Sequence, residues 1–135
     1  MDLFLCAQDI QFITFGLVSH PTPTLPSGRG GGLRIEKTFE VPPEKYLASF
    51  DAFLREQQVL PEHISRLLVV NGPGSFTASR VSVVIANTFA FVRKIPVIPV
   101  ENPDRLPIEK LLPILQTLPE HIFVTPAYDR PPNIT

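Results

Sequence analysis

The hexapeptide Gly72-Pro73-Gly74-Ser75-Phe76-Thr77 constrains the fold most, because of what stands on each side of it. An apolar run over 67–70 precedes it and predicts a buried strand, and apolar residues with helical spacing follow it as far as Lys94. A strand that turns directly into a helix leaves free backbone N–H groups at the helix start. We expect a structural junction in which Ser75 or Thr77 caps the helix.

The same turn allows a second interpretation, because a helix N-terminus can hold an anion. The turn lacks the lysine of a phosphate loop and the third glycine of a dinucleotide fingerprint. A small nucleotide- or anion-binding protein that uses Gly72–Thr77 therefore remains the alternative hypothesis for the function.

The order of the remaining patterns predicts an α/β fold with a mixed sheet. Alternation and helical spacing predict strands over 3–7, 10–18 and 33–41, a helix over 44–58, a strand over 65–70, the long helix, a strand over 95–100 and a short helix over 106–112. A Pro-, Gly- and Ser-rich loop over 19–32, a last short strand over 122–124 and a Pro-rich tail complete the prediction.

The hexapeptide also resembles the GPGSFTGLR signature of the TsaB family, the non-catalytic subunit of the bacterial system that makes N6-threonylcarbamoyladenosine in tRNA. Here it continues as Ala78-Ser79-Arg80, which keeps the arginine. Residues 44–54 resemble the first helix of that family, and residues 95–100 resemble the strand after its second helix. Pro126-Ala127-Tyr128-Asp129-Arg130 is similar to a P-x-Y-x-R motif near the end of many relatives.

The resemblance implies an actin-like (ASKHA, ribonuclease H-like) single lobe, with a mixed sheet and packed helices, over residues 1–101. Residues 102–135 are then a Pro-rich extension, with a short helix and an extended tail, that is left from a second lobe. The implied function is a scaffold that pairs with TsaD, dimerises with itself when alone and joins a TsaE-like ATPase in a larger complex. The modified adenosine lies next to the tRNA anticodon, and the scaffold contacts tRNA only indirectly.

Composition fits this role. A formal net charge of −1 argues against a broad grip on nucleic acid, which would need a basic stripe. One cysteine, Cys6, excludes an internal disulfide and is expected to be a buried, inert thiol. No signal peptide is evident, and the apolar runs are too short to cross a bilayer. We expect a cytoplasmic protein without a membrane segment.

Catalytic machinery is not recognisable, so we expect no enzymatic activity, no metal and no cofactor. The first hairpin reads Cys6-Ala7-Gln8-Asp9, without the hydroxyl side chain of an actin-like phosphate loop. The three histidines, His20, His63 and His121, lie far apart and do not form the H-x-x-x-H pair of the catalytic paralogue. Ser75 lacks the flanking pattern of a nucleophile elbow.

The long helix is apolar on two sides, which a small domain does not obviously cover. We assign the larger side chains to the sheet side, and the opposite stripe of small ones to a partner. The first stripe is Val81, Val84, Ile85, Phe89 and Val92. The expected helix-on-helix interface is Ser79, Val83, Ala86 and Ala90, flanked by Phe50 and Phe53. Burial of the small stripe under the preceding helix is the alternative.

Overall fold

The computed structural model describes residues 1–18, 33–72, 74–108 and 110–111. Three strands come first along the chain: β1 (Asp2–Cys6), β2 (Ile13–Val18) and β3 (Leu33–Phe39). A 3-10 turn at Pro43–Lys45 leads into α1 (Tyr46–Glu56), and a second at Pro61–His63 precedes β4 (Arg66–Gly72). The order closes with α2 (Phe76–Arg93) and β5 (Val97–Glu101).

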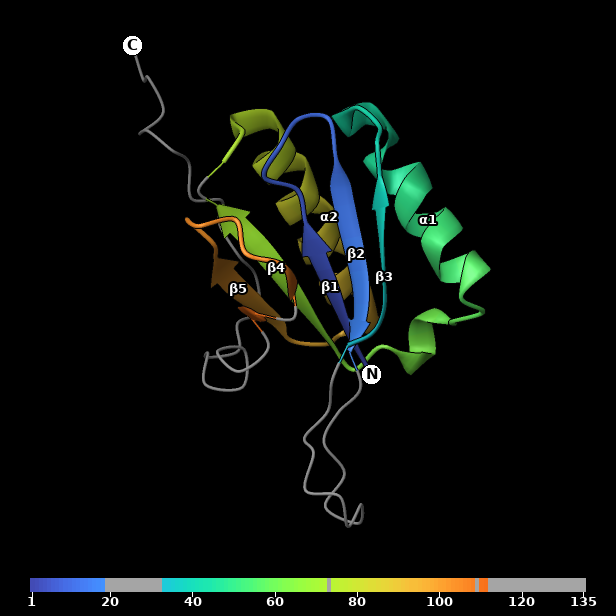
Figure 1. Cartoon of the computed structure of the whole chain (residues 1–135). Helices are drawn as coiled ribbons and strands as arrows, with labels where there is room; N and C mark the ends of the chain where they lie inside the picture. The colour runs from blue at the N-terminus through green and yellow to red at the C-terminus, as the bar shows by residue number, and fades with distance from the viewer. Residues whose placement is uncertain (19–32, 73, 109, 112–135) are drawn as a thin grey trace.

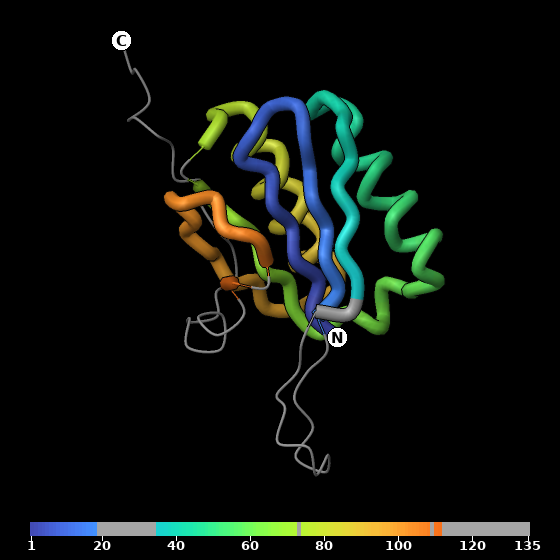
Figure 2. The backbone as a smooth tube through the Cα atoms, in the orientation of Figure 1, coloured from blue at the N-terminus to red at the C-terminus, as the bar shows by residue number. Residues whose placement is uncertain are grey.

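These strands form one mixed sheet in the order β3-β2-β1-β4-β5. β1 pairs antiparallel with β2 and parallel with β4, β3 pairs antiparallel with β2, and β5 pairs parallel with β4. Both helices lie behind the sheet in the view of Figure 1, α1 beside β3 and α2 behind β1 and β4. The carboxyl ends of β1, β4 and β5 therefore meet at the upper edge, where the β1–β2 turn and the start of α2 also lie (Figure 2).

The first hairpin has a longer turn than the sequence predicts, because β2 begins at Ile13 and not at Ile10. The Asp9 side chain accepts a hydrogen bond from the Gln11 backbone N–H at 3.2 Å, and its carbonyl accepts one from Phe12 at 3.2 Å. Such a side-chain-stabilised turn competes with the strand ladder. The prediction that the second strand starts at Ile10 is therefore wrong.

Aromatic rings fill the space between the sheet and the two helices. Phe15 of β2 contacts Phe50 and Phe53 of α1, with ring centroids 5.7 and 5.5 Å apart. Phe50 in turn meets Phe89 of α2 at 5.4 Å, edge to face. These rings lock α1 to α2 and to the sheet, so Phe50 and Phe53 are core residues of this chain.

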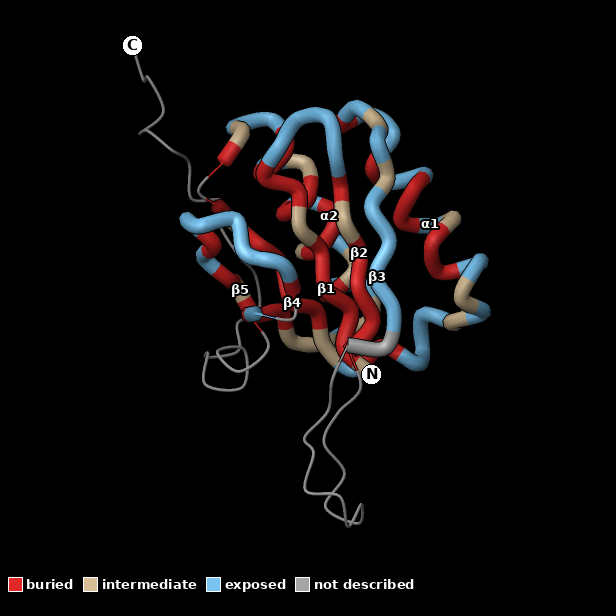
Figure 3. Tube along the Cα trace, in the orientation of Figure 1, coloured by how far each residue is buried: buried red, intermediate tan, exposed pale blue. Residues whose placement is uncertain are grey.

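The opposite face of the sheet carries a smaller apolar cluster. Residues after β5 cross this face, where the buried Ile108 and Leu111 pack on Phe4 and Ile98. Figure 3 shows the contrast between the buried strands β1 and β4 and the exposed edge strand β3. Among the described residues, the helices thus cover one side of the sheet, and the segment that carries Ile108 and Leu111 covers part of the other.

The predicted loop over 19–32, the strand over 122–124, the Pro-rich tail, His20 and His121 lie outside the described residues. So does Pro73 of the hexapeptide. The short helix predicted over 106–112 is described only to residue 111, and residues 108, 110 and 111 have helical backbone.

Candidate functional site

The junction after β4 is built on close backbone contact with the first hairpin. Gly72 has a φ of 136°, a conformation that side chains with a Cβ rarely adopt. A Cβ on Gly74 would lie 2.7 Å from the Gln8 carbonyl oxygen, so only glycine fits there. The Ser75 N–H donates to that same carbonyl at 2.8 Å. The two glycines therefore belong to a structural junction, as the sequence predicts.

A buried polar network joins this junction to the end of β5. The Gln8 side chain donates from Nε2 to the Asn102 carbonyl at 2.6 Å, and Asn102 donates from its backbone N–H to Gly72 at 2.9 Å. The Asn102 side chain donates to the Leu106 carbonyl and accepts from its N–H, both at 2.9 Å. Gln8 and Asn102 are each nearly fully buried, so the network fixes the carboxyl ends of three strands.

The helix start is already occupied by the chain itself. Ser75 is the N-cap of α2, and its Oγ accepts from the Ala78 N–H at 3.3 Å. The Ser75 N–H is taken by Gln8, and the Gln8 backbone fills the space next to Gly74. Two of the N–H groups at this turn, those of Ser75 and Ala78, therefore already have acceptors within the chain, which favours the structural junction over the alternative anion-binding hypothesis. It also gives Ser75 a capping role rather than that of a nucleophile.

The prediction for the two faces of α2 is right only in part. Ile85 is buried in the core and Val81 and Phe89 pack against it, as predicted, but the small stripe is buried too. The small stripe is buried within the chain at all four positions, Ser79, Val83, Ala86 and Ala90. Its three apolar members belong to the main hydrophobic core. Val84 and Val92, expected in the core, are 56% and 68% exposed, so that expectation is wrong. The expected partner residues are therefore not on the surface, and Phe50 and Phe53 are buried with them.

The physical reason is side-chain size. The sheet surface under α2 carries bulky residues such as Leu67 and Val69, which fill the interlayer space from below. Because Ala86 and Ala90 are small, the axis of α2 can come close to the sheet, and no gap is left around the bulky sheet residues. From the sequence, we expect these small side chains to let a helix of another chain approach closely. They instead let α2 approach its own sheet closely. The alternative, burial of the small stripe within the chain, is therefore right in part: the stripe is buried, but α2 packs mainly on β4 rather than on α1.

The exposed face of α2 is the surface that sequence reasoning missed. Phe91 is 79% exposed, and Val84 and Val92 lie beside it on the outer side of the helix. Arg80 and Thr88 share this side and are also exposed. The small residues were the available signal, because small side chains let a helix pack closely on a sheet. On α1, Leu47 is likewise 63% exposed.

The remaining predicted groups are structural. His63 lies exposed in a 3-10 turn, where its Nδ1 accepts from the Leu60 N–H at 3.2 Å. Burial raises the pKa of the Cys6 thiol to about 11, so the thiol is protonated and unreactive at neutral pH. Within the described residues, no three histidine, cysteine or acidic side chains gather as metal ligands. In the same residues, neither α-helix is both long and apolar enough for a membrane crossing.

Comparison with known proteins agrees with this architecture. A family model described as TsaD, tRNA N6-adenosine threonylcarbamoyltransferase, matches residues 43–106, slightly less than half of the chain. No curated protein matches the sequence. Among solved structures, YeaZ from Pseudomonas aeruginosa aligns with a TM-score of 0.58 and 20% identity, over 75% of this chain and 44% of that one.

A second solved structure is described as an uncharacterized protein with similarity to peptidase YeaZ from Pseudomonas aeruginosa. It aligns with a TM-score of 0.55 and 21% identity, over 76% of this chain and 44% of that one. The chain thus spans less than half the length of both structures. The sheet order and these alignments confirm the predicted actin-like, ribonuclease H-like α/β fold, and the resemblance to TsaB holds as a likeness to the fold of YeaZ.

Proposed function

We propose that this chain is a non-catalytic scaffold that pairs with a TsaD-like catalytic subunit through the outer face of α2. In that role it supports N6-threonylcarbamoyladenosine modification of the tRNA adenosine next to the anticodon. The observation that carries the proposal is the exposed apolar face of α2, formed by Val84, Phe91 and Val92. The YeaZ-like fold and the partial match to the TsaD family model support the choice of partner.

Exposure of this face is costly for an isolated chain. A large aromatic side chain such as Phe91 gains free energy when another surface removes it from water. Apolar side chains that gather on one face of a helix mark interaction surfaces more often than scattered ones do. The polar groups Arg80 and Thr88 on the same side suit the rim of a helix-on-helix contact.

The other parts of the proposal follow from the same role. The chain is not itself an enzyme, it dimerises through the same face when TsaD is absent, and it contacts tRNA only through its partners. A TsaE-like ATPase joins in a larger complex, and the assembly works in the cytoplasm. The formal net charge of −1 supports indirect contact with tRNA, since direct binding favours a basic surface.

The proposed domain division places the YeaZ-like lobe at residues 1–101 and an extension at residues 102–135. The end of β5 at Glu101 supports this boundary. Residues 102–111 still pack on the open face of the sheet through Ile108 and Leu111. The start of the extension therefore stabilises the lobe.

The test is assembly with a purified TsaD from the same organism, measured by size-exclusion chromatography with light scattering. Phe91→Glu should weaken the complex at least about tenfold, because it introduces a charge into an apolar contact. Leu60→Glu is the matched control, since Leu60 is 54% exposed but precedes a 3-10 turn and is not part of α2. Both variants should unfold at the wild-type temperature, because both side chains are exposed.

Two results would contradict the proposal. If Phe91→Glu assembles as the wild type does, the outer face of α2 is not the interface. If the chain alone transfers the threonylcarbamoyl group to tRNA without TsaD, it is an enzyme and not a scaffold.

A further inference from the structure

A hollow on the open face of the sheet is not used by the proposed scaffold role. It has a volume of about 360 Å³ and lies on the side away from α1 and α2. The strand register builds its floor: Cys6 pairs with Thr14, and Thr14 pairs with Thr38, so these side chains point to one face. In the next row, Glu36 of β3 and Phe4 of β1 flank Gly16 of β2.

Gly16 explains why the floor is hollowed between these two residues. A glycine in the middle strand projects no side chain, so nothing rises between Glu36 and Phe4. The walls come from other segments: the first hairpin supplies Phe12, and the segment after β5 supplies Arg105 and Leu106. The hollow therefore has an apolar part near Phe4 and a polar part near the paired hydroxyls of Thr14 and Thr38, 2.7 Å apart.

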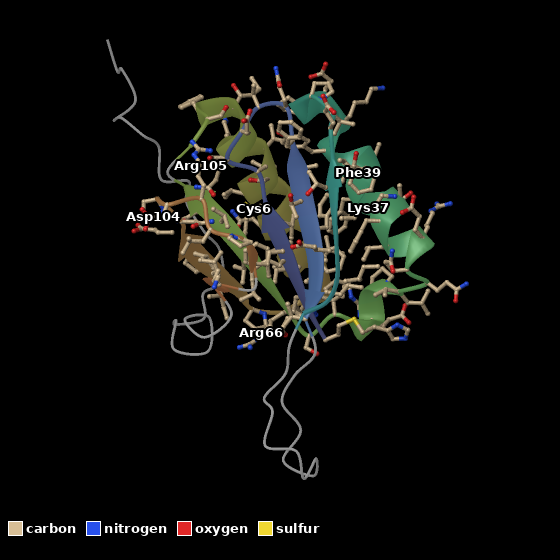
Figure 4. The ribbon with its side chains drawn as sticks, in the orientation of Figure 1. Cys6, Lys37, Phe39, Arg66, Asp104 and Arg105 are labelled. Carbon is tan, nitrogen blue, oxygen red and sulfur yellow. The ribbon has the colours of Figure 1, made fainter. Side chains whose placement is uncertain are left out.

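Opposite charges face this hollow from different segments. Arg105 lies at the end of β1, near Cys6 (Figure 4), and its Nη1 donates to the Gln8 carbonyl at 3.3 Å. Glu36 lines the hollow from β3, two strands away from β1. Neither group forms a salt bridge with any described residue. Asp9 also lines the hollow, but its carboxylate is engaged by the N–H of Gln11 in its own turn.

Two further observations support a built site. Arg105 has a φ of 53°, and its N–H donates to the Asn102 carbonyl at 3.2 Å, so the turn after β5 holds its backbone beside the hollow. The Cys6 thiol on the floor responds to both charges: beyond the effect of burial, Arg105 lowers its pKa and Glu36 raises it.

We propose that this hollow binds a free α-amino acid as its zwitterion, with the carboxylate on Arg105 and the ammonium group on Glu36. The apolar side chain of the ligand then lies against Phe4 and Leu106. The volume is at the lower end of the range for small-molecule sites, roughly 300 to 1,000 Å³, which favours a small ligand. The carboxylate of Glu36 and the guanidinium of Arg105 suit a zwitterion better than a nucleotide, whose phosphates would need several cations.

The experiment uses the full chain labelled with ¹⁵N and three matched probes. L-leucine carries both charged groups, 4-methylpentanoate lacks its amino group, and 3-methylbutylamine lacks its carboxylate. Amide shifts report binding and its location. The variants are Arg105→Gln and Glu36→Gln, and the controls are Arg55→Gln and Glu62→Gln, which lie in α1 and in the turn before β4. Thermal unfolding checks that all four fold.

Leucine should shift the amides of Cys6, Thr14 and Glu36, and each pocket variant should weaken it about tenfold, the usual effect of one charge-assisted contact. Arg105→Gln should weaken the acid and spare the amine, and Glu36→Gln should do the reverse. The controls should bind as the wild type does. No binding of leucine at millimolar concentration would overturn the proposal. Equal binding of leucine and the acid, with no effect of Glu36→Gln, would do so too, because the hollow would then be a simple anion site.

Discussion

The two faces of α2 have similar hydropathy and different roles. Ala86 and Ala90, on one face, are enclosed by the fold, whereas Phe91 and Val92, on the other, are mostly exposed. A pattern that records only apolar against polar residues cannot tell these faces apart. Side-chain volume can, because a helix on a sheet of bulky Leu and Val residues comes close only through small side chains. The comparison teaches that small residues mark contact within the chain here, whereas large ones occur on both faces: Val83 and Ile85 are buried, and Phe91 is exposed.

The sharpest test of this comparison is to place a large ring on each face. Ala86→Trp should destabilise the fold by about 3 kcal/mol or more, because a ring inserted under α2 overpacks the sheet-side core. Val84→Trp, on the outer face of the same helix, should change stability by less than about 0.5 kcal/mol. Urea unfolding followed by circular dichroism measures both. Equal losses for the two variants would mean that the faces are not distinguished by burial.

On α1, Tyr46 has a buried ring and a hydroxyl group that needs a hydrogen-bond partner. Its hydroxyl donates to the carbonyls of Asp9 and Phe12, each at 3.1 Å, and so ties α1 to the hairpin turn. Tyr46→Phe should cost about 1.5 kcal/mol at neutral pH, because these carbonyls lose their donor. The measurement is the free energy of unfolding of both proteins in urea.

The cost of Tyr46→Phe should also depend on pH. Burial, and then the charge of Asp9, raise the pKa of Tyr46 from 10.0 to about 12. The unfolded chain therefore loses this proton first, and the wild type loses stability as the pH rises from 10 towards 12. The phenylalanine variant has no such proton. The difference in stability between the two proteins should shrink over this range, and a constant difference would contradict the raised pKa.

A smaller effect is expected at the start of α2. Ser75→Ala should destabilise the chain by about 1 kcal/mol, because the Ala78 N–H loses its cap. Thr77→Ala is a suitable control, since Thr77 is exposed within the helix and is not the cap. Thermal unfolding compares the two. A larger loss of stability for Thr77→Ala would mean that Thr77, and not Ser75, caps the helix.

The smallest effect should have the opposite sign. The Ser79 hydroxyl is fully buried and has no hydrogen-bond partner among the described residues. Ser79→Ala should therefore stabilise the chain by about 0.5 kcal/mol, since alanine also has the higher helix propensity. A loss of stability in urea unfolding would show that the hydroxyl has a partner after all.

Local features of this fold can be predicted from the sequence, and contacts between distant residues cannot. The glycines at 72 and 74 and the Ser75 cap act within a few residues of each other, so their pattern indicates their role. The bond between Gln8 and Asn102 joins positions 94 residues apart, and neither residue stands in a motif. Arg105 and Glu36 are also far apart in the sequence, and no motif around either residue indicates that both line the same hollow.

The prediction of which face of α2 is buried was wrong in part for a different reason. Both stripes of α2 are apolar and both recur at helical spacing, so periodicity alone supports either assignment. The bulky side chains of β1 and β4 that decide between them belong to other elements, and their volume matters only once the layers are stacked. The resemblance to TsaB supplied the fold class, but it did not indicate which side of the helix the sheet would cover.

The carbonyl of Gln8 accepts hydrogen bonds from the Ser75 N–H at the start of α2 and from the Arg105 side chain at the wall of the hollow. One peptide group is therefore a common anchor for two surfaces that lie on opposite sides of the sheet. A shift of the start of α2 should therefore reach the carbonyl that holds Arg105. The contact is close, because the oxygen of the same carbonyl lies 2.7 Å from where a Cβ on Gly74 would be.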